Sequence, residues 1–243
     1  MITGGSRGIG AATARLAADR GYRVAVTFRV NQDAAEAVVR SIEASGGEAI
    51  AVQADVASER DVMRLFETVD ARLGRLDALV NNAGVLDRQT TVAAMSTERI
   101  LRTLAVNVVG PFQCSREAVL RMATSRGGRG GAIVNVSSRA AQYGSPFEYV
   151  DYAASKGALE SLTVGLAREV AQDGIRVNAV RVGHIYTDLH AMGGEPDRVE
   201  RVKHAVPMKR GGQPEEVARA ILWLLSDEAS YSTGAFLDVS GGR

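Results

Sequence analysis

The stretch TGGSRGIGAATA, residues Thr3–Ala14, holds four glycines, and three of them, Gly4, Gly8 and Gly10, form a spaced motif directly before a helical pattern. Their spacing, G-x-x-x-G-x-G, differs from the G-x-G-x-x-G of the standard dinucleotide-binding fingerprint. The physical basis is the same. Glycine lets the backbone approach a pyrophosphate, and a helix N-terminus offers unpaired N–H groups at the positive end of its dipole. A glycine-rich turn can be only a turn, but its position at the head of a series of β-α units favours a bound dinucleotide.

Apolar runs rich in β-branched residues alternate with helical patterns along the rest of the chain. Their near-continuous Val, Ile and Ala content predicts strands buried on both faces, as in a parallel sheet. No linker interrupts the pattern, so we expect a single-domain α/β fold over residues 1–243: a doubly wound, Rossmann-like parallel sheet with helices on both faces. The predicted strands are Tyr22–Phe28, Glu48–Val56, Leu76–Gly84, Gly131–Ser138, Ile175–Gly183 and Gly234–Val239, and the predicted helices include Asp33–Ser45, Glu59–Leu73, Ala153–Gln172 and Pro214–Ser226.

The composition argues against several classes of protein. Hydrophobic residues make up 46% of the chain, enough for a large core, and the net charge of +1 gives no reason to expect a nucleic acid or an anionic membrane as a partner. Cys114 is the single cysteine, and the three histidines lack ligand-like spacing, so we expect neither an intramolecular disulfide nor a metal site. No apolar run has the length of a membrane span or of a signal peptide, and we expect a cytoplasmic protein.

Two polar segments depart from the alternation. The run SRGGRGG, Ser125–Gly131, is similar to an RNA-binding RGG segment, but it is short and lacks aromatics, which favours a surface loop. A longer polar region at about 184–213 follows the C-terminal end of a predicted strand. Ligands bind at that edge of open α/β sheets, so this region is a candidate lid over a substrate, with a passive surface excursion as the alternative.

The residues at the end of the predicted strand Tyr22–Phe28 bear on the choice of cofactor. An acid usually stands there and accepts a hydrogen bond from the ribose 2′-hydroxyl. Here Phe28 and Arg29 take its place, and Arg7 in the glycine loop is a second cation nearby. The missing acid and the two cations favour a 2′-phosphate, and therefore NADP(H) over NAD(H). The alternative is that both arginines are merely solvated.

Several motifs in the right order resemble those of the short-chain dehydrogenase/reductase family, and the resemblance runs almost from end to end. Within the family the chain is similar to single-domain members related to 3-oxoacyl-carrier-protein reductases and sugar dehydrogenases. The motifs are TGGSRGIG at the start, Asp55-Val56, NNAG at Asn81–Gly84, VNVVG at Val106–Gly110, VNVSS at Val134–Ser138, and Tyr-x-x-x-Lys at Tyr152–Lys156.

The resemblance implies a set of cofactor-binding residues. The glycine loop would hold the phosphates, Asp55 would accept from the adenine amino group, and Asn82 to Gly84 would line the adenosine side. The family usually has Pro-Gly after the sixth strand where this chain has Val182-Gly183, so the loop there has a freer φ. With Arg29 added, the expected residues are Gly4, Ser6, Arg7, Gly8, Ile9, Gly10, Arg29, Asp55, Val56, Asn82, Ala83, Gly84, Tyr152, Lys156, Gly183, Ile185 and Thr187.

The resemblance also implies a catalytic set of Asn107, Ser138, Tyr152 and Lys156. Tyr152 and Lys156 are four residues apart and share a helix face. A nearby ammonium stabilises phenolate, so we expect Lys156 to lower the pKa of Tyr152 and to fit it for acid–base catalysis. Ser138 rather than Ser137 would contact the substrate oxygen, since alternation along the strand lets only one point at the site. Asn107 would lie at a helix distortion and hold a water in a proton relay.

These residues predict an NADP(H)-dependent oxidoreductase that interconverts carbonyls and secondary alcohols. A non-catalytic dinucleotide sensor on the same fold is the alternative, and a nucleic-acid binder is disfavoured by the charge. The family implies a homotetramer, with the helix after Tyr152 and the strand near Ala235–Val239 as candidate surfaces. Only Met1 and Ile2 precede Thr3, whereas a central strand needs about five or six residues. We therefore expect either residues upstream or an unusually short first strand. The sequence does not name the substrate.

Overall fold

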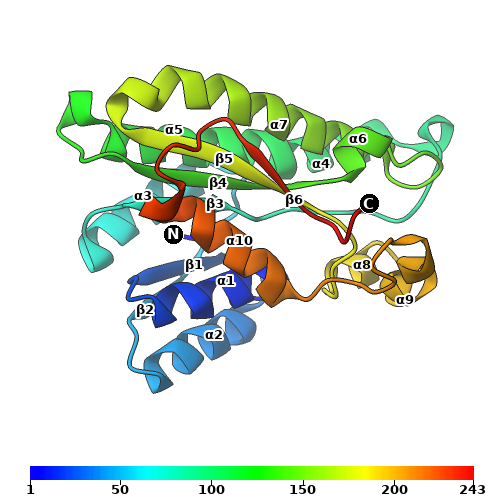
Figure 1. Ribbon diagram of the computed structural model, residues 1–243, viewed down its shortest axis with the longest axis horizontal. Helices are drawn as coiled ribbons and strands as arrows, with labels where there is room; N and C mark the ends of the chain where they lie inside the picture. Colours follow the sequence, from blue (N-terminus) through cyan, green and yellow to red (C-terminus); the bar gives the residue numbers. More distant parts are fainter.

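The computed structural model describes residues 1–243 and shows a parallel sheet between two layers of helices (Figure 1). The strands are β1 (Val24–Phe28), β2 (Ala49–Gln53), β3 (Ala78–Asn81), β4 (Gly131–Ser138), β5 (Ile175–Val182) and β6 (Phe236–Val239). The helices are α1 (Gly8–Asp19), α2 (Gln32–Ala44), α3 (Glu59–Leu73), α4 (Thr97–Leu104), α5 (Gly110–Met122), α6 (Ala140–Tyr143), α7 (Val150–Val170), α8 (Leu189–Met192), α9 (Arg198–Val202) and α10 (Pro214–Leu225). The predicted α/β class is confirmed.

The first three residues join two groups of strands into one sheet. β1 pairs with β2, and β3 to β6 pair in sequence order, all parallel. Ile2 bridges Val26 of β1 on one side and Val80 of β3 on the other. The N–H of Ile2 donates to the carbonyl of Ala25 at 2.8 Å, and the N–H of Thr3 donates to that of Val80 at 3.0 Å. The first strand is thus a single bridged residue between β1 and β3, in the order β2-β1-Ile2-β3-β4-β5-β6.

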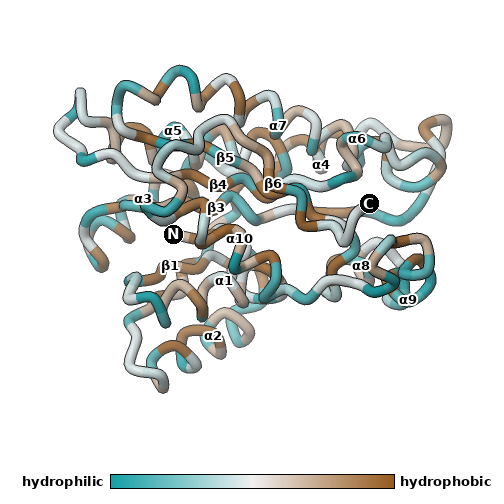
Figure 2. Tube along the Cα trace, viewed as in Figure 1, coloured by the Kyte–Doolittle hydropathy of each residue, from teal (hydrophilic) through white to brown (hydrophobic).

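Each face of the sheet is covered by its own set of helices. On one face α3, α5 and α7 pack a core that includes Phe66, Met122 and Val170. On the other, α1, α2 and α10 pack a core that includes Val38 and Ile221. Figure 2 shows hydrophobic positions along the strands and along α10, whereas the region of α9 is largely hydrophilic. None of the helices is long and apolar enough to cross a membrane.

Local signals in the sequence set several helix starts. The side chain of Asn31 accepts a hydrogen bond from the N–H of Ala34 at the start of α2, and Ser58 does the same for Asp61 at the start of α3. Pro214 occupies the first turn of α10, where its missing N–H has no cost. These caps place the helix starts within a residue or two of the predicted positions.

Burial on both faces holds only for the inner strands. β1 is buried throughout, but Ile50 and Val52 of the edge strand β2 are half-exposed, as is most of the edge strand β6. The prediction of full burial is wrong for these two strands because each has a neighbour on one side only. Strands β2 and β3 also end earlier than predicted, which leaves 54–56 and 82–84 as loops at the carboxyl edge of the sheet.

Close backbone packing explains most of the glycines of Ser125–Gly131. A Cβ on Gly128 would lie 2.2 Å from the carbonyl oxygen of Met122, and one on Gly130 would lie 2.4 Å from that of Gly174. Only glycine fits such approaches. The segment is a tight turn into β4 that leaves Arg126 and Arg129 exposed, as the surface-loop interpretation requires.

Candidate active site

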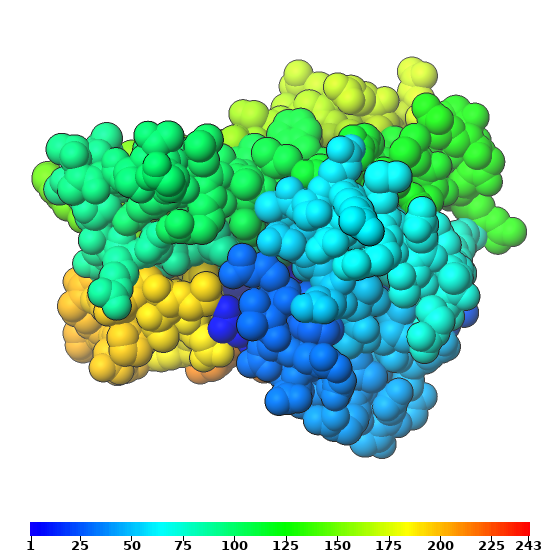
Figure 3. Space-filling view, turned by 180° about the vertical axis from the view of Figure 1, so that it is seen from behind, coloured from blue at the N-terminus to red at the C-terminus, as the bar shows by residue number.

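A cleft lies at the carboxyl edge of the sheet, between the glycine loop, the loops after β1 to β3, and the segment that follows β5. In Figure 3 the yellow and orange residues of that last segment lie against the dark blue N-terminal loop. The predicted cofactor residues that line the cleft are Gly4, Ser6, Arg7, Gly8, Ile9, Arg29, Asp55, Val56, Asn82, Ala83, Gly84, Tyr152, Lys156 and Thr187.

The glycine loop forms a cradle for an anion at the start of α1. Gly4 and Gly8 have φ values of 63° and 53°, which favour glycine. No side chain caps α1, so its first N–H groups and the positive end of its dipole are available to a phosphate. Asn82 supports the loop from β3, since its Nδ2 donates to the carbonyls of Thr3 and Gly4 at 2.9 and 3.0 Å.

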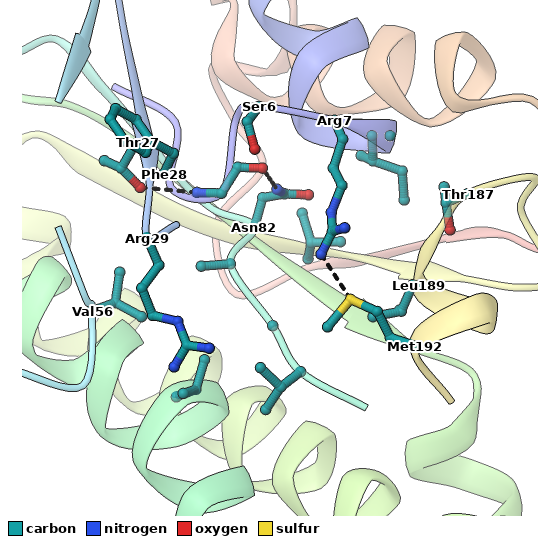
Figure 4. A pocket seen from close by; sticks show the side chains of 18 of the residues that line it. Ser6, Arg7, Thr27, Phe28, Arg29, Val56, Asn82, Thr187, Leu189 and Met192 are labelled. Atoms are coloured by element: carbon teal, nitrogen blue, oxygen red, sulfur yellow. Dashed lines mark hydrogen bonds between the residues drawn. The ribbon is translucent and has the colours of Figure 1, made fainter. Parts of the chain in front are cut away.

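Arg7 and Arg29 enter the cleft from different elements (Figure 4). Arg29 follows β1; its side chain is 62% exposed, and Nη1 lies 3.8 Å from Oδ2 of Asp55. Arg7 precedes α1, and its Nη2 lies 2.7 Å from the sulfur of Met192 in α8. Phe28 is buried beside them. The cleft therefore holds two cations where NAD-specific sites place an acid.

Three predicted cofactor residues lie behind the wall of the cleft. A Cβ on Gly10 would be 2.5 Å from the carbonyl oxygen of Gly4, and one on Gly183 would be 2.8 Å from Cα of Ser240. The side chain of Ile185 is buried in the core that contains α1 and α10. These residues shape the cleft through backbone packing, and only the main chain of Ile185 is left for contact with a ligand.

Tyr152 and Lys156 lie in the first two turns of α7 and both line the cleft. The ammonium of Lys156 is 5.5 Å from the centre of the Tyr152 ring and donates to the carbonyl of Val136 at 2.7 Å. Ser138, the last residue of β4, lies close enough to Tyr152 to affect its pKa, and its hydroxyl accepts from the N–H of Ala140 at 3.1 Å. Ser137 lines the cleft, which Ser138 does not, but the hydroxyl of Ser137 is engaged by Glu160, since it donates to Oε1 at 3.1 Å. The structure therefore brings Ser138, Tyr152 and Lys156 together.

The pKa values of this group are set by burial. Burial raises the pKa of Tyr152 to about 12, and the nearby hydroxyl of Ser138 opposes the rise without cancelling it. Burial also lowers the pKa of Lys156 to about 8. The expectation that Lys156 lowers the pKa of Tyr152 is therefore wrong for the protein alone. Desolvation of the phenolate outweighs the ammonium at 5.5 Å.

Asn107 lies in a π-helical turn, Ala105–Val109, between α4 and α5. It is completely buried. Its Oδ1 accepts from the N–H of Val85 at 2.8 Å, and its Nδ2 donates to the carbonyl of Val85 at 3.0 Å and to Oγ of Ser155 at 3.1 Å. The side chain thus ties the loop after β3 to α7, one turn from Tyr152.

Two charge clusters near the cleft were not predicted. Arg198 of α9 is buried and bonds to Glu148 and to Glu195, which fastens the segment after β5 to the start of α7. Only the spacing of Glu195 and Arg198, three residues apart, could have indicated part of this cluster. The second cluster joins Arg99 to Asp151. A charge directly before Tyr152 was visible, but its partner is 52 residues away.

Comparison with known proteins identifies the family. A family model described as Enoyl-(Acyl carrier protein) reductase matches residues 4–243. A crystal structure of a short-chain type dehydrogenase/reductase from Mycobacterium marinum superposes with a TM-score of 0.93 at 33% identity, over 99% of this chain and 93% of that one. The chain belongs to the short-chain dehydrogenase/reductase family.

Other members of the family are also similar over their full length. The oxidoreductase YgfF of Escherichia coli is 59% identical over 100% of this chain and 98% of its own. A 3-oxoacyl-acyl-carrier-protein reductase of Synechocystis is 40% identical over 100% of this chain and 95% of its own. A metagenomic blue fluorescent protein in complex with NADPH has a TM-score of 0.89 at 35% identity, over 99% of this chain and 95% of its own. The protein is thus an oxidoreductase of the short-chain dehydrogenase/reductase family.

Proposed function

We propose that the protein transfers a hydride between NADP(H) and a carbonyl or secondary alcohol, with Tyr152 as the general acid and base. The observation that carries this proposal is one continuous cleft. It reaches from the uncapped start of α1, which suits a phosphate, to the half-buried Tyr152 and the buried Lys156. When bound, the nicotinamide cofactor supplies the hydride, and the protein supplies position and the proton.

Each member of the catalytic set has a distinct role in the proposal. In the direction of reduction, Tyr152 gives its phenolic proton to the carbonyl oxygen. Ser138 lies near that phenol and would orient the same oxygen. Lys156 holds its charge beside the phenol ring and contacts the cofactor ribose. Asn107 holds the loop after β3 against α7. From its π-helical turn it would also serve the proton relay.

The preference for NADP(H) rests on the two arginines of the cleft. Arg29 ends β1 where an acid would repel a 2′-phosphate, and Arg7 approaches from the glycine loop. A guanidinium can offer two parallel donors to phosphate oxygens, which makes these contacts strong when partly shielded from water. The NADPH complex of the metagenomic relative supports the same choice.

The substrate end of the cleft is bordered by the segment after β5. Leu189 and Met192 of this segment line the cleft beside Thr187, so we propose that it covers the bound substrate. Relatives that are 40% and 37% identical are 3-oxoacyl-acyl-carrier-protein reductases. Oxoacyl thioesters are therefore the first compounds to test, ahead of other carbonyl compounds.

The proposal is tested by following NADPH absorbance with a panel of oxoacyl thioesters, ketones, aldehydes and quinones. We expect turnover with at least one class, and the reverse reaction with the matching alcohol and NADP⁺. Tight NADPH binding without turnover of any compound would contradict the proposal and favour the non-catalytic sensor.

We further propose that the protein assembles as a homotetramer. Exposed apolar side chains gather on α4 and α5 and on the turn between them, at Leu101, Val109, Phe112 and Leu120. On the neighbouring α7, Gly157 and Gly165 leave open space where a second helix can approach. These helices lie on one side of the sheet in Figure 1, which suits the burial of apolar surface between copies.

A further inference from the structure

Arg99 is a buried arginine that takes no direct part in the proposed reaction. It lies in α4, and its side chain is only 10% exposed. Nε donates to Oδ2 of Asp151 at 2.8 Å, Nη2 donates to Oδ1 of Asp151 at 3.1 Å, and Nη1 donates to the carbonyl of Arg88 at 2.5 Å. One guanidinium therefore binds two segments at once, the start of α7 and the loop that follows β3.

Asp151 is the residue directly before Tyr152. Its carboxylate also accepts from Oγ1 of Thr103, the next turn of α4, at 3.3 Å. Burial acts to raise the pKa of Asp151, but the hydrogen bonds from Arg99 and from the Tyr152 backbone hold it below its usual value. The carboxylate is thus charged at neutral pH, and the ion pair is closed under ordinary assay conditions.

At the C-terminal end of α4, a second residue also connects α7 with the loop after β3. Asn107, in the turn that continues α4, bonds to Ser155 of α7 and to Val85 of the loop after β3. Contacts from α4 and its continuation therefore hold α7 on both sides of Tyr152, at Asp151 and at Ser155. The same element holds the loop at Val85 and at Arg88.

We propose that Arg99 is a positioning residue for the reaction: through Asp151 and the carbonyl of Arg88, it fixes Tyr152 relative to the loop that leaves β3 along the cleft. This inference rests on the proposed function, in which Tyr152 exchanges a proton with the substrate. It assigns to α4, an element outside the cleft, control over where the reacting oxygen of Tyr152 lies.

The chemistry of the pair fits positioning better than stability. A buried ion pair is a weak source of folding free energy, and apolar residues of similar volume often replace one without loss. An apolar pair cannot, however, fix the relative orientation of the two segments that it joins. The planar guanidinium satisfies both carboxylate oxygens and a carbonyl in one orientation, whereas the ammonium of lysine has no such fork.

The test compares two variants that separate geometry from charge and from stability. Arg99→Met with Asp151→Leu removes both charges together, and Arg99→Lys retains the cation but loses the fork. For each we would measure kcat, the KM for the carbonyl substrate, the Kd for NADPH and the unfolding temperature. We expect kcat to fall about 10- to 100-fold in both variants, because misplacement by an ångström costs about that much. We expect the Kd for NADPH to stay unchanged and the double variant to unfold near the wild-type temperature.

Arg40→Met is the matched control, since it breaks an ion pair with Glu36 on α2 that is exposed on both sides, and we expect wild-type kcat. The inference is overturned if either variant retains wild-type kcat, or if kcat and NADPH affinity fall together with the unfolding temperature. Tyr152→Phe in the same assay tells the two proposals apart. If it retains turnover, the proposed function fails; if it is inactive while the Arg99 variants keep kcat, only the positioning inference fails.

Discussion

The phenol of Tyr152 is the residue on which the proposed chemistry depends. Tyr152→Phe removes the proton and keeps the ring, so we expect kcat to fall by about two to four decades, the usual contribution of general acid–base catalysis. NADPH binding, measured by fluorescence, should not change. Tyr231→Phe, at a fully exposed tyrosine, is the control. Near wild-type turnover in Tyr152→Phe would exclude the mechanism.

The buried charge of Lys156 lowers the free energy of unfolding of the protein in the absence of a cofactor. Burial lowers its pKa from 10.5 to about 8, so between these values the unfolded state binds more protons and stability rises with pH. Below pH 8 the cost is fully present and amounts to about 3 kcal/mol, less about 1 kcal/mol for the hydrogen bond to Val136. We therefore expect Lys156→Met to be inactive and yet to unfold several degrees higher at pH 7.

The gain in unfolding temperature of Lys156→Met over the wild type should shrink as pH rises from 8 to 10.5. Thermal unfolding of the cofactor-free protein at pH 7 and pH 10 measures it. Lys203→Met, which removes a lysine paired at the surface with Glu200, should show no such pH dependence. A gap that stays constant across this range would mean that Lys156 is not desolvated.

Arg7 and Arg29 should set the choice between cofactors. Each charge-assisted contact contributes about 1.5–3 kcal/mol, and the 62% exposure of the Arg29 side chain places it at the lower end. A total of about 2–4 kcal/mol corresponds to a preference for NADPH of roughly thirty- to several-hundred-fold in kcat/KM. Arg7→Ala with Arg29→Ala should remove most of it, mainly by weakening NADPH, while Arg40→Ala on α2 should not. Equal kcat/KM for NADPH and NADH in the wild type would show that both arginines are merely solvated.

At the scale of elements, the segment after β5 is fastened by charge. Arg198→Met leaves Glu148 and Glu195 without their buried partner, and we expect a local loss of about 2 kcal/mol. That raises the open population of the segment roughly thirty-fold. Limited proteolysis should then cut within 189–205 faster, and the KM for substrate should rise. Lys203→Met, at a partly exposed pair with Glu200 in the same segment, should leave both unchanged.

The elements that repeat a local pattern were the ones that the sequence predicted well. β4 has the predicted bounds, as does α3, because strong apolar periodicity and a capping serine mark them. The spacing of the motifs was likewise enough to predict that Ser138 lies near Tyr152. The contacts of Arg99 with Asp151 and of Arg198 with Glu148 were not, since residues about 50 apart meet only through the fold. The direction of the Tyr152 pKa was missed because burial of the phenol cannot be read from its neighbours in sequence.

At the scale of the whole molecule, the exposed apolar face of α4 and α5 predicts assembly. Phe112→Glu places a charge on this face, where the side chain of Phe112 is exposed. We expect the wild type to be a tetramer by light scattering at micromolar concentration and Phe112→Glu to shift toward smaller species. Trp223→Glu, on α10 at the other side of the sheet, is a control for the added charge. A monomeric wild type would contradict the proposed assembly.

The contact between Arg7 and the sulfur of Met192 makes one side chain common to two sites. On the proposed function Arg7 turns to the cofactor phosphate and gives up its present geometry toward the thioether, so we expect the occupancy of the cofactor site and the position of α8 to be thermodynamically linked. Such linkage is reciprocal. If a bound cofactor changes the equilibrium between two positions of α8 by some factor, fixing α8 in one position changes the affinity for the cofactor by the same factor. On the proposed function, the cofactor and the substrate covered by α8 would therefore affect each other's binding without touching, and we expect a substitution at Met192 to change the cooperativity between them.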